Sequence, residues 1–261
     1  MQILRCLTAE TPELSARELI ASTGLPKPTF FRLAATLCSA GLLHYSKASA
    51  TFMLAPGLLT LATSLWARTH VRQLAFSQMQ ALADRVRGQV SLALGMELDL
   101  VFVELAQSRE CSTFRPAMGA HISLSRTATG RAYLAALPAG QAQRYVDSVA
   151  AVDAQQGQWL AMRLTETHRD LQERGFCVSR GDLLRELQAI AVPVRANAPD
   201  EIYVFTCTVP VFELAPEQLE GDLGPRLVAL ARSAEAAMGH SPDESGSSWF
   251  APPPVPELPN K

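Results

Sequence analysis

The chain has 261 residues, 48% of them hydrophobic and 18% charged, with a formal net charge of −2 at pH 7. This composition excludes a disordered chain, a collagen and a disulfide-dense miniprotein, and the length favours two domains over one. Residues 1–90 contain 9 Lys and Arg against 4 Asp and Glu, whereas residues 91–261 contain 14 against 21, and this asymmetry suggests a polyanionic partner for the first part only.

The first elements in chain order predict a helix-turn-helix. Residues 1–7 form a short apolar helix, and Ser15 followed three residues later by Glu18 marks the start of a second one, because each side chain satisfies a free backbone donor of the other residue. Gly24 ends that helix as a left-handed residue. The prolines in residues 26–28 are tolerated only in a first helical turn, so a third helix starts there and extends to about residue 40.

Two short β runs, residues 42–45 and 51–54, predict a hairpin wing after the helices. The second helix of a helix-turn-helix, here the one that starts at residues 26–28, lies in the major groove, where its first residues reach bases and phosphates. The predicted DNA contacts are at the start of that helix and on the wing: Lys27, Thr29, Phe31, Arg32 and Lys47. The alternative is a helix pair that packs against another protein, with its basic residues as ordinary solvated charges.

These residue types suit different parts of a DNA duplex. Arg32 suits a bidentate contact to guanine, whereas Lys27 and Lys47 suit the phosphate backbone or the minor groove. Phe30 and Phe31 are adjacent on a helix, about 100° apart, so they cannot both be buried. We predict that Phe30 is buried and that Phe31 faces the DNA.

Residues 57–70 predict a helix that links the two parts of the chain. Its apolar stripe, which includes Leu58, Leu61 and Leu65, is wider than a short isolated helix needs. We expect this stripe to pack on a second subunit, because palindromic DNA sites favour two-fold dimers; the alternative is a helix packed on the core of its own chain. The uncharged residues 48–67 do not predict a membrane span, since proline, glycine and hydroxyl residues interrupt them.

From about residue 70 the pattern changes to a mixed one that predicts an α+β domain, an antiparallel sheet with helices on it. A helix is expected over residues 73–87, and strands over 90–94, 100–105, 189–194 and 202–209. No nucleotide-binding glycine loop, zinc-protease motif or nucleophile elbow occurs, so we expect no catalytic residue, no cofactor and no metal, and hence no enzyme. The five cysteines lie far apart and predict a reduced cytoplasmic protein without a structural zinc.

Several motifs occur in a fixed order over nearly all of residues 1–240, and the main ones are Leu14 to Leu19, Gly24 to Thr29, Gly41-Leu42-Leu43, Thr127 to Ala132, Arg174-Gly175-Phe176 and Ile190 to Val194. Together they resemble the IclR family of bacterial transcription regulators. The resemblance implies a winged helix-turn-helix domain over residues 1–56, a linker helix over 57–70 and a GAF-like effector domain over 71–240. It also implies dimers or tetramers. The proline-rich residues 241–261 are predicted to be a disordered tail.

The resemblance also implies where a small effector binds. The positions that correspond to the family's effector contacts are Ala128, Thr129, Ser179, Ala189, Thr206 and Thr208. The first two start a helix, whose free N–H groups suit a carboxylate. Many members have aspartate at Ser179 and some have cysteine at Ala189, and the family glycine at Glu186 is absent here. These departures favour a bulkier organic acid, aromatic or branched, over a small and highly polar one.

The sequence therefore predicts a metabolite-responsive regulator whose partners are double-stranded operator DNA, an organic acid and further copies of the chain. It predicts no membrane partner. The alternative from another class is a metabolic enzyme or a ligand-binding protein whose winged helix mediates protein contacts. The enzyme needs a positioned nucleophile or an acid and base pair, and the sequence shows neither.

Overall fold

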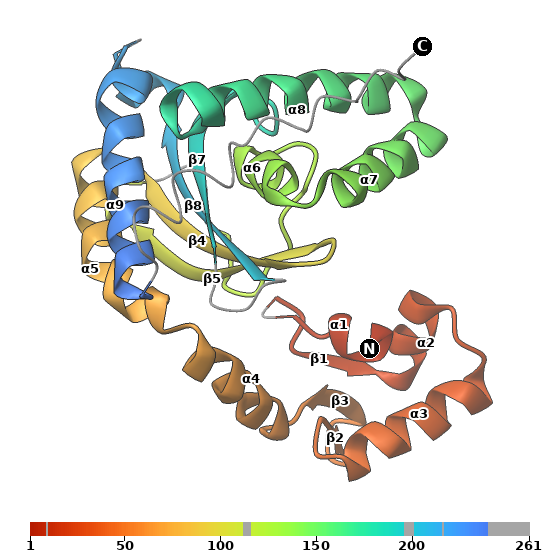
Figure 1. The fold of residues 1–261 in the computed structure, drawn as a ribbon. Coiled ribbons are helices and arrows are strands. Elements are labelled where there is room, and N and C mark those ends of the chain that lie inside the picture. The colour runs from red at the N-terminus through yellow and green to blue at the C-terminus, as the bar shows by residue number, and fades with distance from the viewer. Residues whose placement is uncertain (9, 112–115, 196–200, 216, 240–261) are drawn as a thin grey trace. The chain divides into compact units, whose positions relative to one another are not determined.

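The computed structural model describes residues 1–8, 10–111, 116–195, 201–215 and 217–239. The chain divides into two compact units, Met1–His70 and Val71–Lys261, which are described separately (Figure 1). The predicted tail, residues 241–261, lies outside the described residues.

The first unit consists of short helices and a small antiparallel sheet. Its elements are α1 (Gln2–Arg5), β1 (Glu13–Ser15), α2 (Ala16–Thr23), α3 (Lys27–Ser39), β2 (Leu43–Ser46), β3 (Thr51–Leu54) and α4 (Gly57–Arg68). Within the described residues the strand order is β1-β3-β2, so the wing predicted as a two-stranded hairpin has a third strand. One apolar core joins α1, α2, α3 and the sheet, built from Ile3, Leu4, Leu7, Leu19, Phe30, Ala34, Leu43 and Phe52.

The predicted start and end of α2 are confirmed at atomic detail. The Ser15 backbone N–H donates to Glu18 Oε2 at 2.8 Å, and the Glu18 N–H donates to Ser15 Oγ at 3.3 Å. Gly24 follows the helix with φ of 65°, a left-handed conformation that glycine adopts without steric cost. The turn into α3 is therefore fixed by local interactions.

The second unit is an antiparallel sheet with helices on both faces, which confirms the predicted α+β class. Its elements are α5 (His70–Arg85), β4 (Gln89–Met96), β5 (Asp99–Gln107), α6 (Ala128–Ala136), α7 (Ala139–Val152), α8 (Ala154–Arg174), β6 (Cys177–Arg180), β7 (Leu187–Arg195), β8 (Glu201–Pro210) and α9 (Gly224–Ala237), with short helical turns at Val211–Glu213 and Leu219–Leu223. In the described part of the chain the strand order is β5-β4-β8-β7-β6.

The two faces of this sheet bury different sets of side chains. Helices α5 and α9 cover one face, and α6 to α8 lie on the other (Figure 1). Along β8, Phe205 and Cys207 pack with α5 and α9, whereas Val204 packs with α6 and α8. Thr206 and Thr208 alternate with Phe205 and Cys207, so they lie on the α6 face. On that face, the end of β8 therefore carries hydroxyl groups where the rest of the strand carries apolar side chains.

Candidate functional site

Helix α3 presents a basic face to solvent. Phe30 is fully buried and packs edge-on against Phe52 with ring centroids 5.7 Å apart, whereas Phe31 is 45% exposed. The structure thus confirms which phenylalanine is buried. Lys27 and Arg32 are exposed, and Thr29 is half-buried. Three of the four predicted contacts on this helix are therefore open to a partner.

The charged residues of α3 and of the β2–β3 hairpin are all basic. No Asp or Glu occurs between Glu18 and Asp84; the acidic residue of the sheet is Glu13 on β1, whose carboxylate accepts from the Thr51 hydroxyl at 2.8 Å. Lys47 is exposed in the turn between β2 and β3, at the tip of the wing. Among the residues that the structure describes, none forms an ion pair with Lys47, Lys27 or Arg32. A phosphate backbone would meet cations that no other group in the described structure neutralises.

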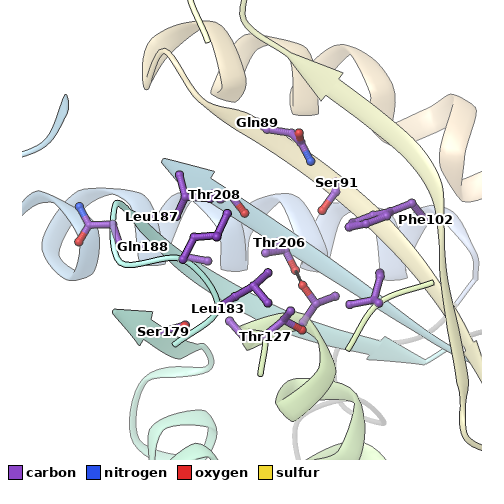
Figure 2. A pocket seen from close by; sticks show the side chains of 15 residues that line it. Gln89, Ser91, Phe102, Thr127, Ser179, Leu183, Leu187, Gln188, Thr206 and Thr208 are labelled. Atoms are coloured by element: carbon purple, nitrogen blue, oxygen red, sulfur yellow. Dashed lines mark hydrogen bonds between the residues drawn. The ribbon is translucent and has the colours of Figure 1, made fainter. Parts of the chain in front are cut away.

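A separate pocket lies in the second unit between α6 and the sheet (Figure 2). It contains about 500 Å³ of empty space, part of which is open to solvent. All six positions that the resemblance indicated are among its lining residues: Ala128, Thr129, Ser179, Ala189, Thr206 and Thr208. The fold thus brings together residues that are up to 80 positions apart in the sequence.

The first turn of α6 forms one end of the pocket. Thr127 is the N-cap, and its Oγ1 accepts a hydrogen bond from the Gly130 N–H at 2.8 Å. Within the described part of the chain, no group accepts a hydrogen bond from the N–H of Ala128 or Thr129. These two donors and the positive end of the helix dipole therefore face the pocket unpaired, an arrangement that attracts an anion.

Close packing fixes this turn against the rest of the unit. The hydroxyls of Thr129 and Thr206 are hydrogen-bonded at 2.9 Å in a buried position, which ties α6 to β8. Gly130 lets the preceding segment approach, since a Cβ there would lie 2.3 Å from the Ser123 carbonyl oxygen. The donors of the first turn are therefore held in place before any ligand binds.

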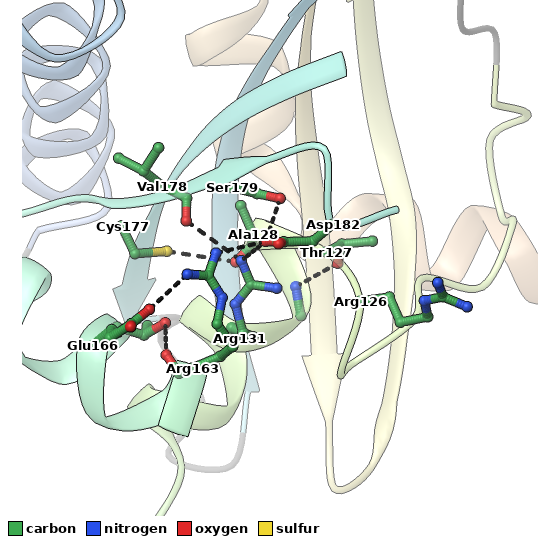
Figure 3. Close-up of polar contacts among 12 residues, drawn as sticks. Arg126, Thr127, Ala128, Arg131, Arg163, Glu166, Cys177, Val178, Ser179 and Asp182 are labelled. Carbon is green, nitrogen blue, oxygen red and sulfur yellow. Dashed lines mark hydrogen bonds and ion pairs between the residues drawn. The ribbon is translucent and has the colours of Figure 1, made fainter. Parts of the chain in front are cut away.

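Ser179 lines the pocket, but its hydroxyl proton is used elsewhere. Ser179 Oγ donates to Asp182 Oδ2 at 2.8 Å. This carboxylate oxygen of Asp182 also accepts from Arg131 Nη2 at 2.7 Å and from Arg163 Nη2 at 2.8 Å (Figure 3). Burial alone would raise the pKa of Asp182, but hydrogen bonds from Arg163 and Ser179 and the two guanidinium charges lower it. Ser179 therefore offers a ligand its lone pairs and not its proton.

Arg131 is a fully buried cation directly behind the pocket. Besides Asp182 it donates to the backbone carbonyls of Ser125 at 3.2 Å and Val178 at 3.4 Å. Arg126 and Arg180 do not line the pocket: both are exposed, and Arg180 pairs with Glu220. Among the described lining residues there is consequently no charged side chain.

Sequence reasoning missed several residues of the pocket. On the floor, Gln89 and Ser91 of β4 are 2% and 1% exposed and point into the cavity (Figure 2). The walls add a set of apolar side chains: Phe102, Ile122, Leu183, Leu184 and Leu187. The only signal in the sequence was that two polar residues alternate along a strand that is otherwise apolar.

The described residues show no alternative chemical centre. Burial raises the pKa of both Cys177 and Cys207 to about 12, so these thiols stay protonated at neutral pH. In the part of the chain that the structure describes, no cluster of His, Cys, Asp or Glu is arranged to hold a metal ion. None of the described helices has the length and apolar character needed to cross a membrane.

Two family models match the chain. The IclR helix-turn-helix domain matches residues 1–47, and the bacterial transcriptional regulator IclR C-terminal domain matches residues 63–235. Among curated proteins, the HTH-type transcriptional regulator TsaQ1/TsaQ2 of Comamonas testosteroni is 26% identical over 243 residues, which are 91% of this chain and 86% of that protein.

Solved structures share the fold over nearly the whole chain. An IclR family transcriptional regulator from Brucella abortus is 31% identical with a TM-score of 0.76, and the match covers 90% of this chain and 89% of that one. An IclR homologue from Microbacterium hydrocarbonoxydans, solved in complex with 4-hydroxybenzoate, is 18% identical with a TM-score of 0.67 and coverage of 91% and 94%.

Proposed function

The chain belongs to the IclR family of bacterial transcriptional regulators, and on that premise we propose that an organic monocarboxylate bound between α6 and the sheet controls its binding to operator DNA. The observation that carries the effector part is the unpaired pair of N–H groups at Ala128 and Thr129, held at one end of a cavity. A helix N-terminus of this kind binds carboxylates through the helix dipole and free donors together.

The walls of the pocket indicate the size of the acid. Phe102, Ile122 and three leucines provide apolar contact area beyond the anion end, and Ala189 leaves space where a larger residue would fill the pocket. A bulky aromatic or branched acid buries this surface, whereas a two-carbon acid leaves it empty. The relative from Microbacterium hydrocarbonoxydans was solved with 4-hydroxybenzoate, which makes benzoates suitable first probes.

For the DNA end, we assign base reading to Arg32 and phosphate contacts to Lys27, Thr29 and the wing residue Lys47, with Phe31 against the duplex. The exposure of four of these side chains and the absence of acidic residues from α3 and the β2–β3 hairpin support this assignment. In this scheme residues 1–56 are the DNA-binding domain, 57–70 the linker and 71–240 the effector domain of a cytoplasmic protein.

The proposed assembly rests on the surface of α4. Leu58 packs against the core of the first unit, but four other apolar side chains of the helix are between 39% and 64% exposed: Leu59, Leu61, Leu65 and Trp66. We place a two-fold contact on this stripe, which pairs two DNA-binding domains for a palindromic operator.

The DNA part is tested by electrophoretic mobility shifts with promoter fragments from around the protein's own gene. Specific binding whose logarithm falls steeply with the logarithm of salt concentration is expected, because several phosphates are neutralised. A protein that binds no fragment better than random DNA at any salt concentration would support the alternative in which the winged helix contacts another protein.

The effector part is tested with Ala128→Pro. Thr127 is extended, with φ of −113° and ψ of 153°, which is the conformation that a residue before proline prefers, and proline is favoured at the first helical position. The change therefore removes one N–H donor with little disturbance of α6. Benzoate binding measured by calorimetry should fall about tenfold, while Ala154→Pro at the start of α8 serves as the matched control. Equal affinity in both variants would refute the proposed carboxylate cradle, which consists of the free N–H groups of Ala128 and Thr129.

A further inference from the structure

The floor of the pocket contains polar side chains with no partner in the protein. Gln89 and Ser91 are 98% and 99% buried, and both point into the cavity (Figure 2). Among the residues that the structure describes, none forms a hydrogen bond with the Gln89 amide or the Ser91 hydroxyl. Thr208, which pairs with Gln89, is half-buried, and no described residue forms a hydrogen bond with its hydroxyl.

Such groups are rare inside proteins. An amide that lines a cavity and bonds no protein group keeps its two donors and its acceptor available to whatever fills that cavity. The neighbouring positions on this face are filled with apolar residues such as Ala93 and Val204, so the fold itself does not require an amide here. Unpaired polar atoms that line a cavity are therefore placed for a ligand.

The register of the sheet locates these groups relative to α6. Ser91 pairs with Thr206, which is hydrogen-bonded to Thr129 and so lies beside the first turn of α6. Gln89 pairs with Thr208, two residues further along both strands. Two residues of a strand span about 7 Å, so Gln89 and Thr208 lie about that much farther from the helix end than the Ser91 row does.

We infer that the pocket has a second, uncharged polar end made by Gln89 and Thr208, and that its ligand is a monoanion with a neutral hydrogen-bonding group at the far side of an apolar body. This inference rests on the proposed carboxylate cradle at the first turn of α6. The ligand body lies along the sheet between the two ends, and a single benzene ring with para substituents has this length. The Gln89 amide both donates and accepts, so a hydroxyl, a carbonyl or an amide fits it.

The absence of charged side chains in the lining determines which charge the ligand can carry at its far end. No Lys, Arg or His among the described lining residues faces the far end, so a second carboxylate there would be buried without a cation. Burying an unpaired carboxylate is much more costly than burying a hydroxyl. A dianion of the same length should therefore be rejected.

Calorimetry with four acids of one shape tests the far end: benzoate, 4-methylbenzoate, 4-hydroxybenzoate and terephthalate. We expect 4-hydroxybenzoate to bind about tenfold more tightly than 4-methylbenzoate, and terephthalate to bind at least tenfold more weakly than 4-hydroxybenzoate. Gln89→Leu should remove the preference for the hydroxyl, so that 4-hydroxybenzoate and 4-methylbenzoate bind with similar affinity. Ser91→Ala, beside the anion end, should weaken all four acids alike, and Gln73→Leu on the exposed surface of α5 is the matched control.

A second measurement needs no ligand. If Gln89 has no structural hydrogen bond in the free protein, Gln89→Leu should not lower the melting temperature, because no hydrogen bond within the protein is lost; the control Gln73→Leu should leave it within about 1 °C. An amide with a structural hydrogen bond would give a clear decrease. A lower melting temperature for Gln89→Leu therefore overturns the inference whatever the acids do.

The outcomes separate this inference from the proposed function. If benzoate binds and Ala128→Pro weakens it, but the 4-hydroxyl adds nothing or terephthalate binds equally well, only the uncharged far end is wrong. If Gln89→Leu weakens benzoate and 4-hydroxybenzoate to the same degree, the amide has no specific role at the far end. If none of the four acids binds the wild-type protein, the carboxylate cradle and the inference built on it both fail.

Discussion

Asp182 gives the sharpest stability prediction, because one carboxylate oxygen accepts three hydrogen bonds. Arg131 Nη2, Arg163 Nη2 and Ser179 Oγ donate to Oδ2 at 2.7, 2.8 and 2.8 Å, and the Arg131 side chain is 1% exposed. Asp182→Asn keeps the shape but leaves the buried guanidinium without a counter-charge. Removing one member of a buried ion pair costs about 3 to 5 kcal/mol, and since Asp182 is 13% exposed and Asn still accepts one bond, we expect about 2 to 4 kcal/mol.

Urea denaturation at pH 7 measures this loss. With a slope of about 2 kcal/mol per molar urea, the midpoint should fall by roughly 1 to 2 M. Glu166→Gln is the matched control, because it removes a carboxylate that bonds the same Arg163 at 2.6 Å but is 39% exposed. Its loss should stay below about 1 kcal/mol. Equal losses for the two variants would show that Arg131 does not depend on Asp182 for its charge balance.

The pH dependence of this pair has a defined sign. The folded-state pKa of Asp182 is lowered, so its contribution is fully present above the unfolded pKa of about 3.9 and is lost as pH falls through the folded value. The difference between wild type and Asp182→Asn should therefore be constant from pH 7 to pH 5 and narrow below pH 4. A gap that already closes between pH 7 and pH 5 would contradict the assignment of the charge to Asp182.

Three further predictions address DNA binding, assembly and the effector. Arg32→Ala should cost about 1 to 3 kcal/mol on the operator and relax specificity at one base pair, whereas Lys27→Ala should weaken all sequences alike and reduce the salt slope by about one, both measured by titration of operator and random DNA. Leu61→Glu with Leu65→Glu should split the dimer in light scattering and abolish operator binding; a variant that stays dimeric places the interface elsewhere. Ala128→Pro should release the operator complex from control by whichever benzoate binds, as followed by mobility shifts with and without the acid.

The elements of the first unit were predictable because their signals are local. The capping box of Ser15 and Glu18 spans four residues, and Gly24 acts on its own backbone. Strand β1 was missed because it is three residues long and forms only by pairing with β3, where the Thr51 hydroxyl donates to the Glu13 carboxylate across 38 positions. A run that short has no periodicity to detect.

The pocket was predictable in part for a different reason. The family resemblance indicated six lining positions, and the fold places all six around one cavity. Gln89 and Ser91 were not found, because the alternation of a strand shows that two residues share a face but not which face holds a cavity. Arg131 was not recognised as buried, since an isolated arginine is predicted at the surface and its partner Asp182 lies 51 positions later.

The position of Arg131 explains why the proposed anion end relies on backbone groups. This arginine lies one helical turn after Ala128, yet its guanidinium is directed to Asp182 and to two carbonyls, and Arg163 shares the same carboxylate. Its charge is thus neutralised behind the pocket and is not available inside it. A bound carboxylate would meet two N–H groups and a helix dipole, which stabilise one negative charge and are too weak to offset a second one buried in the same cavity. The proposed selectivity for a monoanion therefore depends on where the arginine's own counter-ion is placed.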